Sequence, residues 1–99
     1  MCGIAGILNL ADAPPVEKSS LERMIGMIRH RGPDGAGFYH KTYIGLAHAR
    51  LSIIDIDGGA QPITNEDRTL WVVFNGEIFN YLELRHDLEQ CGHCFTTHS

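Results

Sequence analysis

The sequence predicts an α+β protein in which antiparallel strands are covered by helices. Two observations lead to this prediction: strand-like and helix-like segments follow one another in the order β, α, β, β, β, α, β, and two of the strand-like runs are separated by almost no residues. The 99 residues could form one small domain, 1–99. A chain this short buries a smaller share of its surface than a typical domain, so we expect it to be marginally stable unless it packs on more protein.

A strand and then a helix are expected in the first third of the chain. Residues 3–10, GIAGILNL, form a short run rich in Ile and Leu that ends at the turn-forming ADAPP. Ser19, with Glu22 three residues later, predicts a capping box at the start of the helix, and Gly32 with Pro33 stops it. Four residues at helical spacing form its apolar face: Leu21, Met24, Ile25 and Ile28.

A hairpin and a central strand are expected in the middle of the chain. The runs 35–41, GAGFYHK, and 43–53, YIGLAHARLSI, are nearly adjacent, which predicts a β-hairpin. A polar loop rich in Gly and Pro, 55–67, comes next. The run 69–76, TLWVVFNG, has the β-branched and aromatic content of a central strand and ends at Gly76.

A second helix and the beginning of another strand are expected in the last fifth. Asn80 with Glu83 predicts a second capping box, and Gly92 is the natural stop of a helix over 81–92. Three side chains of this helix are expected to face a core: Tyr81, Leu84 and Leu88. The run CFTTHS, 94–99, reads as the first residues of a strand that the chain does not complete.

Composition excludes several classes of partner. The formal charge of −4 and the pI near 5.8 give no basic field for phosphates, so no nucleic acid is expected. No apolar stretch approaches the roughly 20 residues that span a bilayer, and the N-terminus lacks the pattern of a signal peptide, so we expect no membrane and a cytoplasmic protein. Three cysteines, an odd number, predict free thiols, at least one of them with a reactive role.

Cys2 is the first candidate for chemistry. Methionine is normally removed when the second residue is small, and Cys2 would then carry a free α-amine. An α-amine titrates near pH ~7.7 to 8.0 and a thiol near ~8.5, so nucleophile and base would share one residue. The alternative is a small apolar residue at the start of a buried strand, and Cys2 alone does not separate the two. Gly3 would leave room for a substrate beside the thiol.

Asn75, Gly76 and Arg50 are the next candidates. A side-chain amide and a glycine N–H at the end of a strand could together hold a developing oxyanion, although these two residues alone favour an ordinary Asn-Gly turn. Arg50 lies in a mostly apolar strand, where an arginine needs an anionic partner. That partner is either a substrate carboxylate held by two hydrogen bonds or the side chain of Asp55.

The remaining histidines and cysteines predict no metal site. His48, in its apolar run, is expected to be a core histidine whose hydrogen bonds are satisfied. Cys91, Cys94 and His98, with His93 between the cysteines, have a spacing that zinc sites use, but no second pair of ligands stands elsewhere in the chain. A zinc-binding module is kept as an alternative on these residues.

Taken together, these residues resemble the class II glutamine amidotransferases, and within them the glutaminase domain of the asparagine synthetase type. The resemblance rests on four motifs in the family's order and at about its spacing: MCGIAGI, RHRGPDG, LAHARLSIIDIDGGAQP and FNGEIFNYLELR. It implies the fold of the N-terminal nucleophile hydrolases, a four-layer αββα sandwich with two antiparallel sheets. It also implies that residues 1–99 are the N-terminal part of the glutaminase domain, an incomplete sandwich.

The resemblance implies a role for each candidate. Cys2 would attack the side-chain amide of glutamine, with its own amine as base, and water would release glutamate from the resulting γ-glutamyl thioester. Asn75 and the N–H of Gly76 would hold the oxyanion. Arg50 would bind the α-carboxylate of glutamine, and the rest of the pocket would be lined by Leu51, Ile53 and Glu77. The RHRGPDG loop would be architectural, a turn behind the nucleophile. In the family an aspartate that binds the substrate's α-amine follows the position of Ser99.

The resemblance also implies partners. L-Glutamine is the expected substrate, and the ammonia would serve ATP-dependent asparagine synthesis from aspartate in a synthetase domain of the same protein. No cofactor is expected in these residues, whereas the synthetase domain would need ATP and Mg²⁺. The family also allows a homodimer, and residues 1–99 alone are expected to be inactive. Other members amidate other carboxylates, including those encoded with exopolysaccharide genes, and a parent protein that kept the fold but lost the glutaminase activity is a further alternative.

Overall fold

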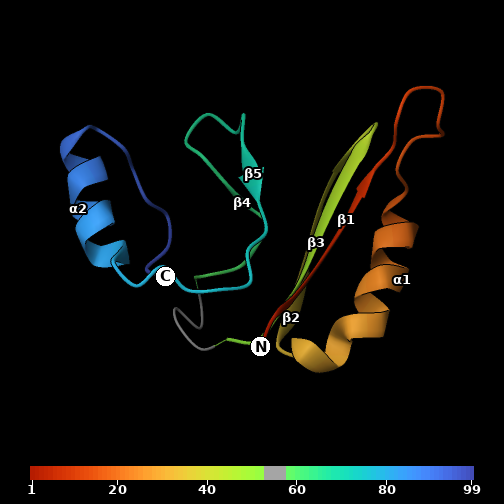
Figure 1. The fold of residues 1–99 in the computed structure, drawn as a ribbon, viewed down its shortest axis with the longest axis horizontal. Coiled ribbons are helices and arrows are strands. Elements are labelled where there is room, and N and C mark those ends of the chain that lie inside the picture. The colour runs from red at the N-terminus through yellow and green to blue at the C-terminus, as the bar shows by residue number, and fades with distance from the viewer. Residues whose placement is uncertain (53–57) are drawn as a thin grey trace.

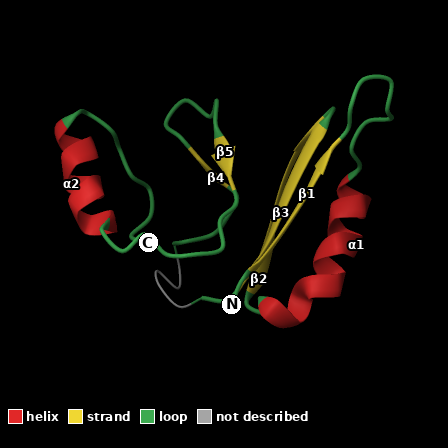
Figure 2. Cartoon of the chain, viewed as in Figure 1, coloured by secondary structure: helices red, strands yellow, loops and turns green. Residues whose placement is uncertain are grey.

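The computed structural model of this chain describes residues 1–52 and 58–99 and has an α+β fold (Figures 1 and 2). It contains two helices and two antiparallel sheets, one of three strands and one of two. The elements in chain order are β1 (Gly3–Leu8), α1 (Lys18–Ile28), a 3₁₀ turn (Arg29–Arg31), β2 (Gly35–Lys41), β3 (Ile44–Arg50), β4 (Ile63–Thr64), β5 (Trp71–Val72) and α2 (Tyr81–Gln90). The predicted fold class is confirmed at this level.

The three-stranded sheet has β3 at its centre, in the order β1-β3-β2. β2 and β3 form the predicted hairpin, in which Lys41 pairs with Ile44 across a two-residue turn. β1 runs antiparallel to β3 with Gly3 opposite Ala49. The beginning of the chain therefore lies beside the end of β3, more than forty residues away in sequence.

Helix α1 covers one face of this sheet and forms the core with it. Leu21 and Ile25 are 0% and 1% exposed and pack on Ala47 and Ala49, which alternate along β3. Small residues on β3 let the helix come close: a Cβ at Gly45 would lie 2.8 Å from a methyl carbon of Leu21. The hydrophobic core is thus formed by small residues on one face of β3 and by the i, i+4 pair on α1.

The start of α1 differs from the prediction. The helix begins at Lys18, its N-cap is Glu17, and Ser19 lies inside the first turn, where its hydroxyl donates to the Glu17 carboxylate at 3.3 Å. No side chain caps the helix, so the capping box predicted from Ser19 and Glu22 is wrong. Burial of Val16 accounts for the shift, because this residue joins the core and brings the chain into the helix two residues earlier than predicted.

The other face of the sheet packs against the hairpin β4–β5. The rings of Tyr39 and Trp71 stack with their centroids 4.1 Å apart. β5 covers only Trp71–Val72 and pairs with β4, which lies in the predicted polar loop. The prediction of one central strand over 69–76 is therefore wrong: among the described residues β5 has a single short partner, and a strand with one partner ends where that partner ends.

Helix α2 has the predicted position but a different environment. Asn80 is its N-cap, as expected, but donates or accepts no side-chain capping bond. None of its residues is buried, and Leu84 and Leu88 are 43% and 41% exposed, so the expected core face is wrong for residues 1–99. The stop at Gly92 is confirmed: this residue has φ of +95°, its N–H bonds to Glu89 O at 3.0 Å, and the next N–H bonds to Leu88 O at 3.1 Å.

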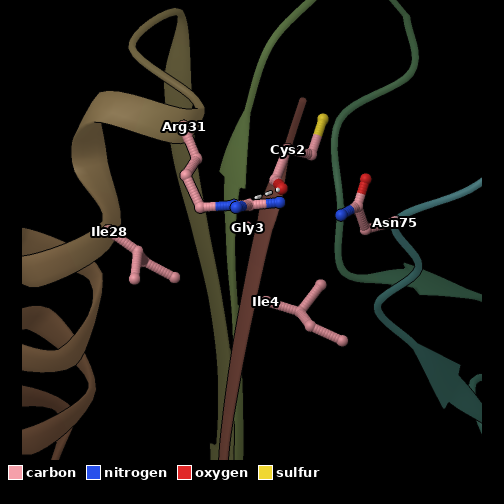
Figure 3. A pocket seen from close by; sticks show the side chains of 6 residues that line it. All are labelled: Cys2, Gly3, Ile4, Ile28, Arg31 and Asn75. Atoms are coloured by element: carbon pink, nitrogen blue, oxygen red, sulfur yellow. Dashed lines mark hydrogen bonds between the residues drawn. The ribbon is translucent and has the colours of Figure 1, made fainter.

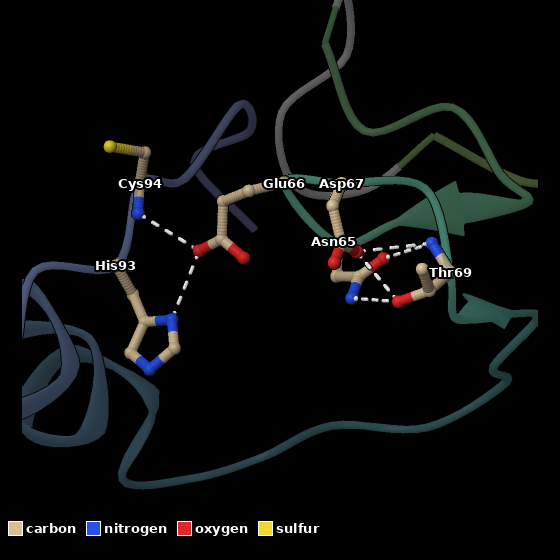
Figure 4. A network of polar contacts seen from close by, with 6 residues as sticks. All are labelled: Asn65, Glu66, Asp67, Thr69, His93 and Cys94. Atoms are coloured by element: carbon tan, nitrogen blue, oxygen red, sulfur yellow. Dashed lines mark hydrogen bonds and ion pairs between the residues drawn. The ribbon is translucent and has the colours of Figure 1, made fainter.

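The residues after α2 do not form the strand predicted over 94–99. They are held instead by Glu66, whose carboxylate accepts hydrogen bonds from the His93 ring at 3.0 Å and from the Cys94 N–H at 3.1 Å (Figure 4). The backbone N–H groups of Glu66 itself and of Cys94, followed by the His93 ring, lower the pKa of this carboxyl. The turn of the β4–β5 hairpin thus anchors the end of α2.

The packed part of the chain has three layers: α1, the three-stranded sheet and the β4–β5 hairpin. In Figure 1, α2 lies beyond the hairpin in the same succession but buries no residue, so a four-layer sandwich is not formed within residues 1–99. Neither helix of the described residues has the length and apolar character to cross a membrane.

Candidate functional site

Cys2 lies directly before β1, half-buried, at the end of β3. Leu51, the residue after β3, donates its backbone N–H to Cys2 Sγ at 3.2 Å, and the thiol approaches the Leu51 carbonyl at 3.5 Å. The pairing of β1 with β3 produces this contact. Gly3 is opposite Ala49, so the residue before β1 lies beside the residues that follow Ala49. A backbone donor is therefore in place to hold a negatively charged sulfur.

An open cavity of about 250 Å³ brings Cys2 together with Asn75. In Figure 3 the Asn75 side chain lies across from Cys2 and Arg31, with its amide nitrogen on the side of the Arg31 guanidinium and the Cys2 backbone. Gly3, Ile4, Ile28 and Arg31 complete its lining. Two residues 73 positions apart in sequence, both predicted as chemical groups, thus share one site.

Arg31 is a lining residue that sequence reasoning did not place in the site. Its Nε donates to the carbonyl of Cys2 at 3.3 Å, and its guanidinium brings a positive charge to the cavity (Figure 3). The motif RHRGPDG was interpreted only as a turn behind the nucleophile. The signal that could have identified Arg31 is the pair of arginines in a motif that the resemblance already linked to the thiol.

The rest of that loop supports the end of β3. Asp34 donates its N–H to Arg50 O at 2.9 Å and accepts the N–H of Ser52 with its carboxylate at 2.8 Å. A Cβ on Gly32 would lie 2.2 Å from the carbonyl of Ala49, so this loop touches β3 with bare backbone. The loop therefore fixes the segment that presents Leu51 to the thiol.

The other predicted site residues lie near this cavity without lining it. Arg50 is the last residue of β3 and is half-buried; Gly76 and Glu77 follow Asn75 and are exposed. Ile53 and Asp55 lie outside the described residues. The predicted pocket contact of Ile53 and the predicted ion pair between Arg50 and Asp55 therefore lie outside them as well.

Gly3 and Gly76 both lie where an added side chain would meet a neighbour. A Cβ on Gly3 would lie 2.8 Å from Cδ1 of Ile28, so Gly3 makes room for helix α1, and it also lines the cavity beside Cys2. A Cβ on Gly76 would lie 2.7 Å from the ring of Phe74, so the close approach at this position is to a neighbouring side chain.

His48 is buried as predicted, but its hydrogen bonds are not satisfied. The residue is 1% exposed, and neither ring nitrogen has a hydrogen-bond partner among the residues that the structure describes. Burial, with the positive charge of Arg50 as a smaller contribution, lowers the pKa of His48, while the backbone of Phe74 works against this shift. Burial thus disfavours the charged form of this ring, which lies next to the backbone that leads to Asn75.

The cysteines at the end of α2 do not form a metal centre. Within residues 1–52 and 58–99, no three His, Cys, Asp or Glu side chains gather closely enough to hold an ion. Cys91 and Cys94 are exposed free thiols, and the His93 ring is bonded to Glu66. The zinc-binding alternative therefore has no assembled site in this part of the chain.

Comparison with known proteins gives a family and several relatives. The model of a family described as "Glutamine amidotransferase domain" matches residues 1–99. "Asparagine synthetase [glutamine-hydrolyzing] 1" of Bacillus subtilis is 47% identical over 102 residues, an alignment that covers 100% of this chain and 16% of the relative. "Probable asparagine synthetase [glutamine-hydrolyzing]" of Dictyostelium discoideum is 46% identical over 101 residues, covering 100% of this chain and 18% of the relative. A plant relative of the same printed name, from Brassica oleracea, is 43% identical over 99 residues, with coverages of 100% and 17%. The chain thus spans about a sixth of the length of these relatives.

Proposed function

Because this chain belongs to the glutamine amidotransferase domain family, we propose that residues 1–99 are the N-terminal part of a glutaminase domain with Cys2 as its nucleophile. The domain hydrolyses glutamine to glutamate and ammonia. The observation that carries this proposal is the shared cavity of Cys2 and Asn75, with the Leu51 N–H at 3.2 Å from the sulfur. A thiol and an amide donor facing one space are the two groups that attack on an amide requires.

The proposed reaction begins when Met1, which is 69% exposed, has been removed and Cys2 carries a free amine. The amine takes the thiol proton, and the sulfur attacks the side-chain carbonyl carbon of glutamine to form a C–S bond. The C–N bond then breaks, and ammonia leaves with the proton that the amine returns. Water hydrolyses the γ-glutamyl thioester, which gives glutamate and restores the thiol.

Each neighbouring residue has a proposed part in this reaction. The side chain of Asn75 and the N–H of Gly76 hold the oxyanion that forms when the carbonyl is attacked. Arg50 pairs with the α-carboxylate of glutamine through its planar guanidinium. Leu51, Ile53 and Glu77 are proposed to line the rest of the glutamine pocket in the complete domain.

The full-length protein is proposed to use the ammonia for ATP-dependent synthesis of asparagine from aspartate. The names of the relatives support this, as does the small share of their length that this chain spans. The remaining length would hold the rest of the glutaminase domain and a synthetase domain that uses ATP and Mg²⁺. Another carboxylate acceptor is the alternative. The cytoplasm is the proposed compartment, since three free thiols suit a reducing environment.

We also propose that the complete domain is a four-layer αββα sandwich. The exposed apolar side chains of the hairpin and α2 support this, among them Val72 at 50%, Leu84 at 43% and Leu88 at 41%. Each Å² of apolar surface that is removed from water stabilises the folded state by about 25 cal/mol, so additional strands between the hairpin and α2 would stabilise both.

The test is a Cys2→Ala substitution in the full-length protein. We expect glutamate release from glutamine to fall by at least about 10³-fold, because the nucleophile is removed, and intact mass to show that the wild-type protein lacks Met1. Cys91→Ala and Cys94→Ala are matched controls, since both thiols are exposed and lie away from the cavity. Hydrolysis that persists in Cys2→Ala would contradict the proposal. Loss of activity in the controls together with bound zinc would favour the metal-binding alternative.

A further inference from the structure

The geometry points to Gln61 as a positioning residue for Asn75. Its side-chain amide makes two hydrogen bonds to the backbone of Phe74: Nε2 donates to Phe74 O at 3.1 Å, and Oε1 accepts the Phe74 N–H at 2.6 Å. Phe74 directly precedes Asn75, so this pair of hydrogen bonds fixes the peptide from which the predicted oxyanion donor projects. This inference rests on the proposed function.

The amide of Gln61 takes the place of a neighbouring strand. β5 is paired only at Trp71–Val72, and its ladder to β4 ends there. Two residues further on, the planar amide offers one donor and one acceptor to the two backbone groups of Phe74, which is the pattern that an antiparallel neighbour would provide. An extended segment that leaves its sheet is thereby kept in place by one side chain.

Gln61 is itself fixed by close packing on the three-stranded sheet. A Cβ on Gly37 of β2 would lie 1.7 Å from the carbonyl oxygen of Gln61, so the two backbones are in direct contact. The stacked rings of Tyr39 and Trp71 join the same two layers at a neighbouring point. A rigid connection therefore runs from β2 through Gln61 and the Phe74 backbone to Asn75, on the cavity with Cys2.

This placement predicts a specific kinetic effect. An oxyanion donor acts when charge develops in the transition state, so a displaced Asn75 lowers kcat and leaves the binding of glutamine largely unchanged. Because Gln61 does not line the cavity, its loss removes no direct contact with the substrate. A displacement of about 1 Å can cost on the order of 10²-fold in rate.

The experiment compares Gln61→Ala, Gln61→Glu and Asn65→Ala in the full-length protein, by steady-state kinetics of glutamate release. We expect kcat of Gln61→Ala to fall by about 10- to 100-fold with KM within about twofold of wild type. Gln61→Glu should fall less, because a carboxylate still accepts the Phe74 N–H but cannot donate to its carbonyl.

Asn65→Ala is the control for a general weakening of the same hairpin. The side-chain oxygen Oδ1 of Asn65 accepts the N–H groups of Thr69 and Leu70, both at 2.9 Å, and makes no bond to Phe74. We expect thermal stability to fall in this variant, with kcat close to wild type. Equal losses of kcat in Asn65→Ala and Gln61→Ala would overturn the inference, because they would show that hairpin stability alone matters.

A second measurement keeps the test decisive if a variant is poorly stable. The γ-aldehyde analogue of glutamine accepts the thiol at its carbonyl carbon, the thiol proton passes to the oxygen, and the tetrahedral adduct resembles the transition state. We expect Gln61→Ala to bind this aldehyde about 10- to 100-fold more weakly, Gln61→Glu to lose less, and both variants to bind glutamate about as well as the wild type. Unchanged aldehyde binding would overturn the role of Gln61, whereas activity retained in Cys2→Ala would overturn the proposed function itself.

Discussion

At the scale of single residues, glycines set how closely the layers approach, because they have no side chain. Gly32 and Gly37 both sit where a Cβ would meet backbone atoms, at 2.2 Å from Ala49 and 1.7 Å from Gln61. Backbone cannot move aside as a flexible side chain can, so these two contacts fix the positions of the RHRGPDG loop and of the segment before β4. Both segments support residues of the candidate site.

Replacement of Gly32 by alanine tests this packing. The added methyl must displace the backbone of Ala49, so we expect Gly32→Ala to lower stability by about 1 to 3 kcal/mol. Gly26→Ala is the matched control, because Gly26 is an exposed helix residue with nothing within 4 Å of the new methyl. It should raise stability by about 0.5 to 1 kcal/mol. Thermal unfolding of both variants measures the difference, and equal midpoints would show that Gly32 does not limit the approach.

The buried ring of His48 gives stability a dependence on pH. Burial and the charge of Arg50 lower its pKa, so below the ordinary histidine value the unfolded chain binds a proton that the folded chain refuses. Its contribution is complete above about pH 6.5 and is lost as pH falls below that value. We expect His48→Leu to reduce the loss of thermal stability on acidification below about pH 6.5, and identical slopes in the two proteins would contradict this.

The residues proposed to carry chemistry were easier to single out from the sequence than the residues that support them. Cys2 and Asn75 have side chains whose chemistry is recognisable in one dimension, and the cavity that they share agrees with their proposed roles. Gln61 and Arg31 matter through backbone groups that they reach across the fold, to Phe74 and to Cys2. Such contacts depend on the path of the chain, which a short motif does not specify.

At the scale of elements, helices and the β2–β3 hairpin follow local patterns, and the second sheet does not. The hairpin was predictable because its two strand-like runs are separated by only two residues. β4 was not, since its two residues follow Pro62 in a polar stretch and become a strand only by pairing with β5. The length of β5 is likewise set by its partner and not by the apolar character of the run 69–76.

The end of α2 offers a test at this scale. Gly92 has φ of +95°, a conformation that costs alanine about 1 kcal/mol, and the two capping hydrogen bonds depend on it. We expect Gly92→Ala to speed amide hydrogen exchange in the last turn of α2 by about fivefold, while Gly92→Asn, which tolerates this conformation, keeps most of the protection. Equal exchange in both variants would contradict the role of the cap.

At the scale of the whole molecule, burial is concentrated in one part of the chain. Within residues 1–52 and 58–99, the five buried apolar residues lie on β3, on α1 and just before α1, and none lies on α2. A helix without a buried face gains little from tertiary packing and depends on its own turns and caps. The 99 residues therefore combine a packed unit of α1 and the three-stranded sheet with a peripheral helix.

Hydrogen exchange of residues 1–99 should show this division. We expect the amides of β3, the central strand, to be the most protected, and those of α2 to exchange at least about 10²-fold faster. Exchange followed by mass spectrometry at peptide resolution distinguishes the two segments. Equal protection of α2 and β3 would show that α2 packs on the rest of the chain in solution.

The stacked pair of Tyr39 and Trp71 gives this chain an optical reporter. Trp71 is the single tryptophan of the sequence, and its ring stacks on that of Tyr39 in the three-stranded sheet. Its emission therefore reads one contact, and not an average over many fluorophores. Separation of the two sheets would change the wavelength and the quenching of that emission even if every helix and strand remained intact.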